Sequence, residues 1–181
     1  MESMKPQKEN FSIKQVDLNG VGGLKVKYEI YEQLGEEEYR YIYQVENQKI
    51  IHSDLYSPFY RLKYKVGGIF NMITVAGFIE ESDADADIKE ATSDLSYSIL
   101  DRIKISGISI VREGSKRFLI IKSVFMAENG YKTVLKTPKI KLDITEDSEI
   151  CEIVSIIKEE VYEYLFNNKQ AQLEVLDGFS A

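Results

Sequence analysis

Basic side chains are concentrated in one stretch of this chain. Residues 101–142 carry ten Lys or Arg against three Asp or Glu, whereas residues 143–181 carry two against ten. Ammonium and guanidinium groups bind phosphates, and aromatic rings beside them stack on unpaired bases. A sheet surface that combines the two therefore suits single-stranded nucleic acid. Lysines on a sheet also provide solubility and protect its edges, so the charge pattern alone does not establish a binding site.

Only part of this basic set can share one face, because side chains alternate along a strand. Lys132 and Lys136 fall on one side of their strand, and Lys104 and Lys122 can join them from neighbouring strands. A smaller group in the first half of the chain can play the same part. The predicted nucleic-acid-binding residues are Lys25, Lys27, Tyr31, Arg40, Lys104, Lys122, Tyr131, Lys132 and Lys136.

The C-terminal segment 168–181 is acidic and holds three apolar anchors, Leu173, Leu176 and Phe179. Such a tail can dock on a replication or recombination protein, or it can lie over the basic sheet and compete with nucleic acid. It can equally pack on its own domain. These alternatives stay open at the level of sequence, and the three apolar residues are the predicted partner-binding residues.

Enzyme and metal-site signatures are missing from the sequence. The single histidine, His52, precedes a predicted helix, where a capping or surface role is simpler than catalysis. There is no glycine-rich phosphate loop and no Cys/His cluster with zinc spacing. Asp83, Asp85 and Asp87 are spaced like the start of a calcium loop, but Ile88 replaces its glycine, which favours a solvated linker. We therefore predict a non-enzymatic protein with no catalytic residues, metal or cofactor.

Bulk composition indicates one soluble domain. The 181 residues suffice for a single core, whereas two separate halves of about 90 residues would each be marginal. No apolar run approaches the roughly 20 residues that cross a bilayer, and the N-terminal residues lack a signal-peptide core. A lone cysteine, Cys151, fits a reducing compartment. We expect a cytoplasmic protein that does not associate with membranes.

The elements that must position the basic residues occur twice. Each half shows three strand-like runs and then a long apolar helical stripe. The first set is 11–18, 23–33, 39–46 and a helix within 58–77; the second is 102–112, 116–126, 131–142 and a helix over 148–167. We predict an α+β fold, a pseudo-duplicated βββα unit in which two antiparallel sheets pack around two long helices.

Local signals refine this organisation. Ser57 before Pro58 predicts the start of the first helix, and Asp147 or Ser148 the cap of the last one. A one-residue shift of the apolar alternation at Gly107 predicts a β-bulge. The predicted domain 1–181 has halves at 11–78 and 96–167, an acidic linker at 79–95 and a tail at 168–181.

Several stretches form a recognisable set: Asp101–Ser109, Lys136–Pro138, Glu160–Leu165 ahead of Gln172-Leu173, and a helix-leading His-x-Asp-Leu at His52–Leu55. Together they resemble a family of functionally uncharacterised tailed-phage and prophage proteins. The order of strands and helix is also similar to Whirly-like single-stranded-DNA-binding folds, in which two sheets flank paired helices. That second likeness implies the same architecture and ligand class.

The functional prediction is a phage single-stranded-DNA-binding accessory for replication or recombination, acting in the bacterial host cytoplasm. One alternative is a protein-interaction module, either a virion component or an inhibitor of a host protein. Another is a subunit of a processivity-clamp-like ring, which would share the internal duplication. The sequence allows a homo-oligomer in each case.

Overall fold

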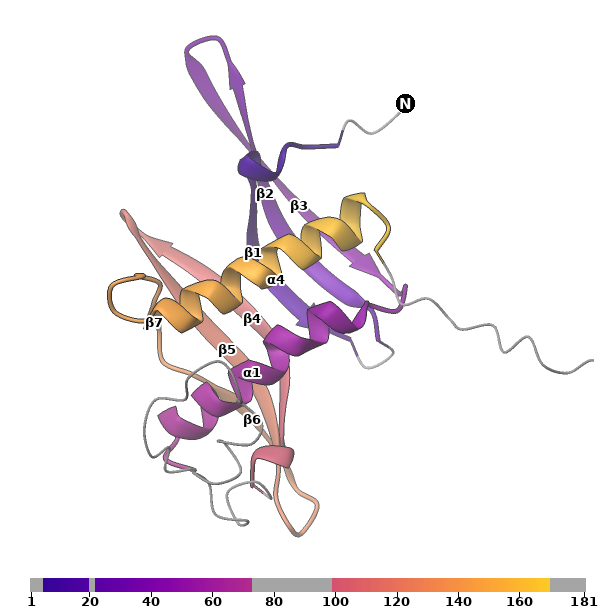
Figure 1. The fold of residues 1–181 in the computed structure, drawn as a ribbon, viewed down its shortest axis with the longest axis vertical. Coiled ribbons are helices and arrows are strands. Elements are labelled where there is room, and N and C mark those ends of the chain that lie inside the picture. Colours follow the sequence, from indigo (N-terminus) through magenta and orange to yellow (C-terminus); the bar gives the residue numbers. More distant parts are fainter. Residues whose placement is uncertain (1–4, 20–21, 73–98, 170–181) are drawn as a thin grey trace, which may run out of the picture.

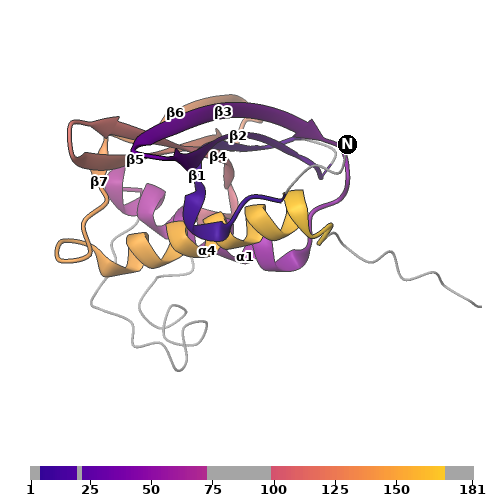
Figure 2. The same ribbon diagram turned by 90° about the horizontal axis from the view of Figure 1, so that it is seen from above.

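The structure is a computed structural model that describes residues 5–19, 22–72 and 99–169. A seven-stranded sheet forms one layer, and two long helices form a second layer on one of its faces (Figures 1 and 2). The elements are a short 3-10 turn η1 (Lys8–Asn10), β1 (Phe11–Leu18), β2 (Leu24–Leu34), β3 (Glu37–Asn47), α1 (Ser53–Ile69), β4 (Ile103–Glu113), β5 (Lys116–Met126), β6 (Lys132–Lys136), β7 (Ile140–Lys141) and α4 (Ser148–Phe166).

The prediction of two sheets around two helices is wrong, because the strands form a single antiparallel sheet. Their order is β3-β2-β1-β4-β5-β6, and β7 pairs with β5. The first strands of the two repeated units join at the centre, where Val16 pairs with Ile108 and Asp17 with Gly107. Each unit would otherwise leave an unpaired edge there, and pairing β1 with β4 removes both edges. The two sheets around paired helices that the Whirly likeness implied are therefore not found in the described residues.

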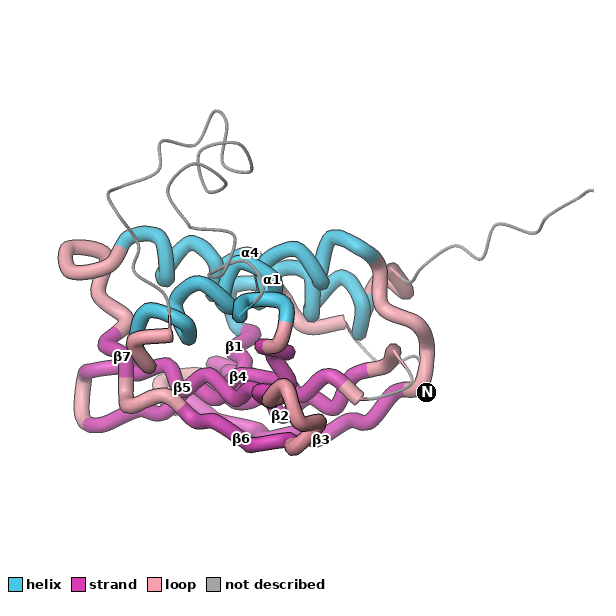
Figure 3. The backbone as a smooth tube through the Cα atoms, turned by 90° about the horizontal axis from the view of Figure 1, so that it is seen from below, coloured by secondary structure: helices cyan, strands magenta, loops and turns pink. Residues whose placement is uncertain are grey.

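The two helices lie side by side and run in opposite directions across the same face of the sheet (Figure 3). Lys65 near the end of α1 pairs with Asp147 at the start of α4. At the other end, Lys169 just after α4 reaches Asp54 in the first turn of α1, 2.6 Å away. With the central β1–β4 pair, this arrangement gives the fold an approximate twofold symmetry.

The hydrophobic core lies between the sheet and the helices. Alternate residues of the central strands point toward the helices, and the apolar stripes of α1 and α4 meet them. Phe11 of β1 packs against Tyr28 and Tyr162, with ring centroids 5.3 and 5.4 Å apart. The fully buried side chains include Leu24, Leu55, Leu62, Ile103, Ile108, Leu119, Ile121, Ile150 and Ile157.

The starts of the two helices differ in how well the sequence predicts them. Asp147 caps α4 as expected, since its carboxylate accepts the Ile150 N–H at 3.0 Å. Helix α1 begins earlier than predicted, at Ser53, and Pro58 lies inside it. His52 is its N-cap residue and accepts the Asp54 N–H at 3.3 Å, which confirms the predicted capping role.

The predicted bulge at Gly107 is present, and glycines lie in the turns of two hairpins. The register between β4 and β5 shifts between Ile105 and Gly107, which confirms the bulge. Two-residue turns close the β2–β3 and β4–β5 hairpins, with Gly35 at a φ of 69° and Gly114 at 60°. Glycine adopts this left-handed conformation at little cost. The same turn chemistry at the same place in both units supports the duplication inferred from the sequence.

Candidate nucleic-acid interface

One face of the sheet is covered by no helix or strand of the described residues, and we call it the open face. Because the buried Leu24, Val26 and Tyr28 point toward the helices, Lys25 and Lys27 between them point the other way. The same alternation places Lys104 and Lys122 on the open face. Paired residues across six strands form one row, Glu46, Lys25, Asp17, Gly107, Lys122 and Lys136.

Two of the predicted lysines in this row are neutralised by carboxylates. Lys122 reaches across β4 to Asp17, with 2.9 Å between Nζ and Oδ1, and Lys25 lies 3.6 Å from Glu46. Gly107 stands between Lys122 and Asp17, and a Cβ on it would lie 2.5 Å from Asp17 Oδ1. The glycine at the bulge therefore lets the Lys122 side chain pass over β4.

Three other lysines of the second unit keep their charge exposed. Lys104, Lys132 and Lys136 are exposed on the open face, and none has an ion-pair partner among the described residues. They surround apolar side chains, because Lys104 pairs with Val124 and Val124 with Val134. Val134 is 67 % exposed. This end of the open face, over β4, β5 and β6, thus combines free cations with apolar surface.

The first unit uses its charges differently. Arg40 lies over the ring of Tyr31, 5.1 Å from its centroid, and the Tyr31 hydroxyl donates to Glu29 at 2.8 Å. Lys14 reaches the same carboxylate at 3.0 Å, and Glu29 is only 2 % exposed. Tyr31 is therefore held in a cluster with Glu29 and Lys14, whereas Lys27 and Arg40 are exposed and have no ion pair in the described structure.

The pKa of Glu29 reflects its hydrogen bonds within this cluster. Burial by itself would raise the pKa of the Glu29 carboxyl, but hydrogen bonds from Lys14 and Tyr31 outweigh it and lower the pKa. Burial, followed by the bond to Glu29, raises the pKa of the Tyr31 phenol. Sequence reasoning missed Lys14 and Glu29, because the contact requires the register of β1 against β2.

Not every predicted residue joins the open-face lysines. Tyr131 is 74 % exposed but precedes β6 and alternates with Lys132, so it does not extend the lysine row. The predicted partner-binding residues Leu173, Leu176 and Phe179 lie outside the described residues, as does the acidic run 83–87. Sequence reasoning also missed the apolar surface of Val124 and Val134, although their alternation with core residues is visible in the printed sequence.

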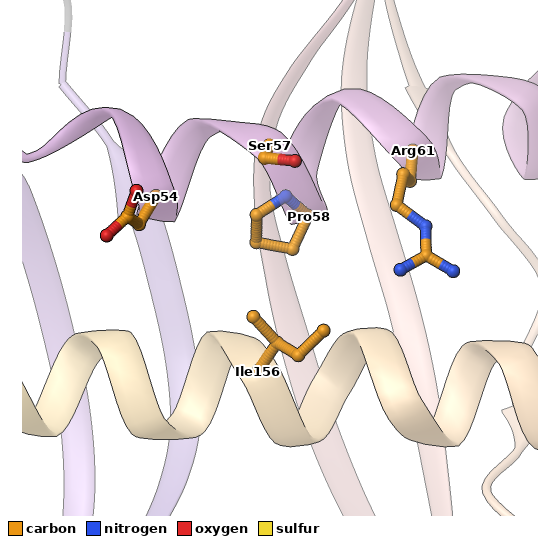
Figure 4. Close-up of a pocket in the computed structure, with 5 residues that line it drawn as sticks. All are labelled: Asp54, Ser57, Pro58, Arg61 and Ile156. Carbon is orange, nitrogen blue, oxygen red and sulfur yellow. The ribbon is translucent and has the colours of Figure 1, made fainter. Parts of the chain in front are cut away.

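A hollow lies between the helices, away from the sheet. It is lined by Asp54, Ser57, Pro58 and Arg61 of α1 and by Ile156 of α4 (Figure 4). The charged groups there already have ion-pair partners. The Arg61 guanidinium lies 3.2 Å from the Glu152 carboxylate, and the Lys169 ammonium pairs with the Asp54 carboxylate. The bond from Lys169 is the largest cause of the lowered pKa of the Asp54 carboxyl. The charged side chains that line the hollow are thus already paired.

The described residues contain neither a metal-ligand cluster nor a helix that could cross a bilayer. No three His, Cys, Asp or Glu side chains gather there in an arrangement that could hold a metal ion. None of the described helices combines the length and apolar character needed to cross a bilayer.

Comparison with known proteins gave no match to a family model, a curated protein or a solved structure. The resemblance to tailed-phage proteins therefore stays a prediction from the sequence.

Proposed function

We propose that the second-unit end of the open face binds single-stranded nucleic acid and that the protein is a non-enzymatic phage replication or recombination accessory. The observation that supports this proposal is the set of three exposed lysines, Lys104, Lys132 and Lys136, on one face with no carboxylate partner in the described structure. Phosphates would contact these ammonium groups. Nucleotide bases would lie on the apolar surface of Val124 and Val134.

The distribution of charge on the sheet and helix layers also favours approach of a polyanion from the sheet side. Helix α4 carries five glutamates against one lysine, and although Arg61 pairs with Glu149 and Glu152, the helix keeps a negative surplus that disfavours phosphates. A polyanion that approaches this molecule would therefore be guided toward the sheet and away from the helices. The overall charge of −7 does not oppose this, because the local field governs the encounter.

One observation favours the alternative, a protein-interaction module. The open face exposes Ile42 at 58 % and Val134 at 67 %, and stacking platforms for bases are usually aromatic. A protein partner would bury these aliphatic groups, and its binding would depend on them more than on the lysines. The two functions are therefore separated by which substitutions abolish binding.

The test is a salt series of fluorescence anisotropy with a labelled single-stranded oligonucleotide. The variant replaces the three free lysines with glutamine: Lys104→Gln, Lys132→Gln and Lys136→Gln. We expect it to lose about 100-fold in affinity at about 0.1 M salt, and its salt slope to fall by about 2, since each lost phosphate contact on a single strand removes about 0.7.

The matched control removes the same charge from the helix layer and its flanking loop, through Lys49→Gln, Lys63→Gln and Lys158→Gln. It should bind as tightly as the unmodified protein. Unmodified protein that shows no binding at low salt would refute the proposal. Equal losses in the two triple variants would also refute it, because binding would then follow total charge.

A further inference from the structure

The outer edge of β3 has the features of a strand that pairs with another chain. It is eleven residues long, its register against β2 has no shift, and no strand of the described residues pairs with its other side. Tyr39, Tyr41 and Tyr43 are each about two-fifths exposed on the side of the helices. The turn end of the β2–β3 hairpin extends past both helices (Figure 1).

The opposite edge of the sheet is protected in a way that β3 is not. Strand β6 has only five residues, with Lys132 and Lys136 at its two ends, and Pro138 follows shortly after. Short length, lysines and proline are the devices by which proteins prevent edge-to-edge pairing. Strand β3 contains no lysine, proline or bulge. The two edges of one sheet therefore differ in availability.

The hairpin fixes which backbone groups of β3 are free. Leu34 and Glu37 flank a two-residue turn and so form a hydrogen-bonded pair, and such pairs alternate along an antiparallel ladder. The odd-numbered residues of β3 therefore direct their N–H and C=O groups toward β2. The even-numbered residues, from Glu38 to Glu46, direct theirs to the open edge.

We propose that a second copy of this chain pairs antiparallel with β3, about a twofold axis at Tyr43. This register joins even-numbered residues to even-numbered residues, as the free hydrogen bonds require. It sets Arg40 opposite Glu46 of the second copy, and the symmetry repeats that pair of opposite charges. A shift of two residues one way sets Glu38 opposite Glu46, and the other way leaves Arg40 opposite Gln48. Of these three registers, only the one centred on Tyr43 sets opposite charges against each other.

The same register also covers the exposed rings. Tyr43 meets its own symmetry mate, and Tyr41 lies opposite Val45 of the second copy, so the aromatic side of β3 becomes interface. Because paired residues face the same side, the two open faces become one continuous surface. The inference goes beyond the proposed function and does not depend on it.

The first experiment measures molar mass by sedimentation equilibrium, without nucleic acid, from about 1 to 100 μM, the range that resolves micromolar dissociation constants. The unmodified protein should approach twice its chain mass of 20.8 kDa. Ile42→Pro removes an N–H that faces the open edge and bonds nothing in β2, so the fold should survive while the dimer is lost. Circular dichroism checks the fold.

A second experiment tests the register. Arg40→Glu and Glu46→Arg should each weaken the dimer by about 30-fold, because every substitution acts twice across the axis. An equimolar mixture of the two variants should restore the dimer, since each glutamate at 40 or 46 then meets an arginine. Residues 40 and 46 of one chain are about 20 Å apart along the strand, so the rescue cannot arise within a chain. Lys136→Glu, the same charge change on β6, should leave the mass unchanged.

Three results would overturn the inference. They are a monomeric unmodified protein at every concentration, a folded Ile42→Pro variant that remains dimeric, and a mixture of charge variants no heavier than its components. None of these results depends on oligonucleotide binding, so a failure here is distinguishable from a failure of the proposed function.

Discussion

Replacement of Gly107 by alanine tests the joint between the two repeated units. Gly107 lies at the bulge of β4 and pairs with Asp17 of β1. A Cβ at this position would lie 2.4 Å from the carbonyl oxygen of Val16 and 2.5 Å from Asp17 Oδ1, well under the 3.0 Å that real Cβ atoms keep. The first neighbour is backbone, and the second is held by Lys122, so neither can move without breaking a contact.

The expected cost follows from that geometry. Overpacking against a fixed neighbour costs about 1–3 kcal/mol, and we expect the upper end because the closest atom belongs to the strand that pairs with β4. For a chain of 181 residues, a loss of about 3 kcal/mol lowers Tm by roughly 6–12 °C. The Lys122–Asp17 ion pair should be lost as well, because the new methyl group occupies the path of the lysine side chain.

The chain offers a matched control for this substitution. Gly68 lies in the last turn of α1, and a Cβ there would meet nothing within 4 Å. Gly68→Ala should stabilise the protein by up to about 1 kcal/mol, since alanine favours helix. Thermal and urea unfolding, followed by circular dichroism, measure both variants. A Gly107→Ala protein as stable as the unmodified one would show that β1 and β4 do not approach as closely as described.

Two further predictions concern ionised carboxylates. Glu29→Gln should lower the free energy of unfolding by about 2 kcal/mol, because Lys14 then keeps its charge in a part-buried site without its partner; urea unfolding at neutral pH measures it. A change under about 0.5 kcal/mol would contradict that reasoning. Hydrogen bonds from the Thr145 hydroxyl, then from Lys141 and the Thr145 amide, lower the pKa of Asp143 to about 2 from 3.8. The ionised Asp143 carboxylate therefore stabilises the fold above pH 3.8, and this contribution is lost as the pH falls toward 2. Asp143→Asn should flatten the acid-unfolding curve between these two pH values. An unchanged curve would contradict the lowered pKa.

The local structure was largely predictable from the sequence. Alternating apolar residues give the strands their positions, as in Leu24, Val26 and Tyr28, and a phase shift at Gly107 predicts the bulge. The last helix agrees with its predicted stripe and cap. The first helix was misplaced because Ser57-Pro58 has the signature of a helix start. In the structure the first turn forms before it, and Pro58 loses only one intrahelical bond there.

The arrangement of the strands could not be predicted in the same way. Alternation shows which residues share a face, but it does not show which strands are neighbours. The pairing of Val16 with Ile108 joins segments from the two halves, and no short-range signal marks it. The predicted binding site missed an ion pair for the same reason. Asp17 neutralises Lys122 from 105 positions away, and only the register between β1, β4 and β5 brings the two together.

The two units share one architecture but differ in how many open-face cations are already paired, and this difference affects where a polyanion would bind. On the first unit, Glu29 binds Lys14 and Tyr31 and Glu46 pairs with Lys25, so two cations there stabilise the sheet, and Lys27 and Arg40 have no ion pair in the described structure. On the second unit, Lys104, Lys132 and Lys136 of the open face have no such partner in the described structure. A cation that is already paired must lose that interaction before it binds a phosphate, whereas an unpaired one has only water to release. The free energy of binding any polyanion should therefore come mainly from β4 to β6, although both units contribute strands to the same face.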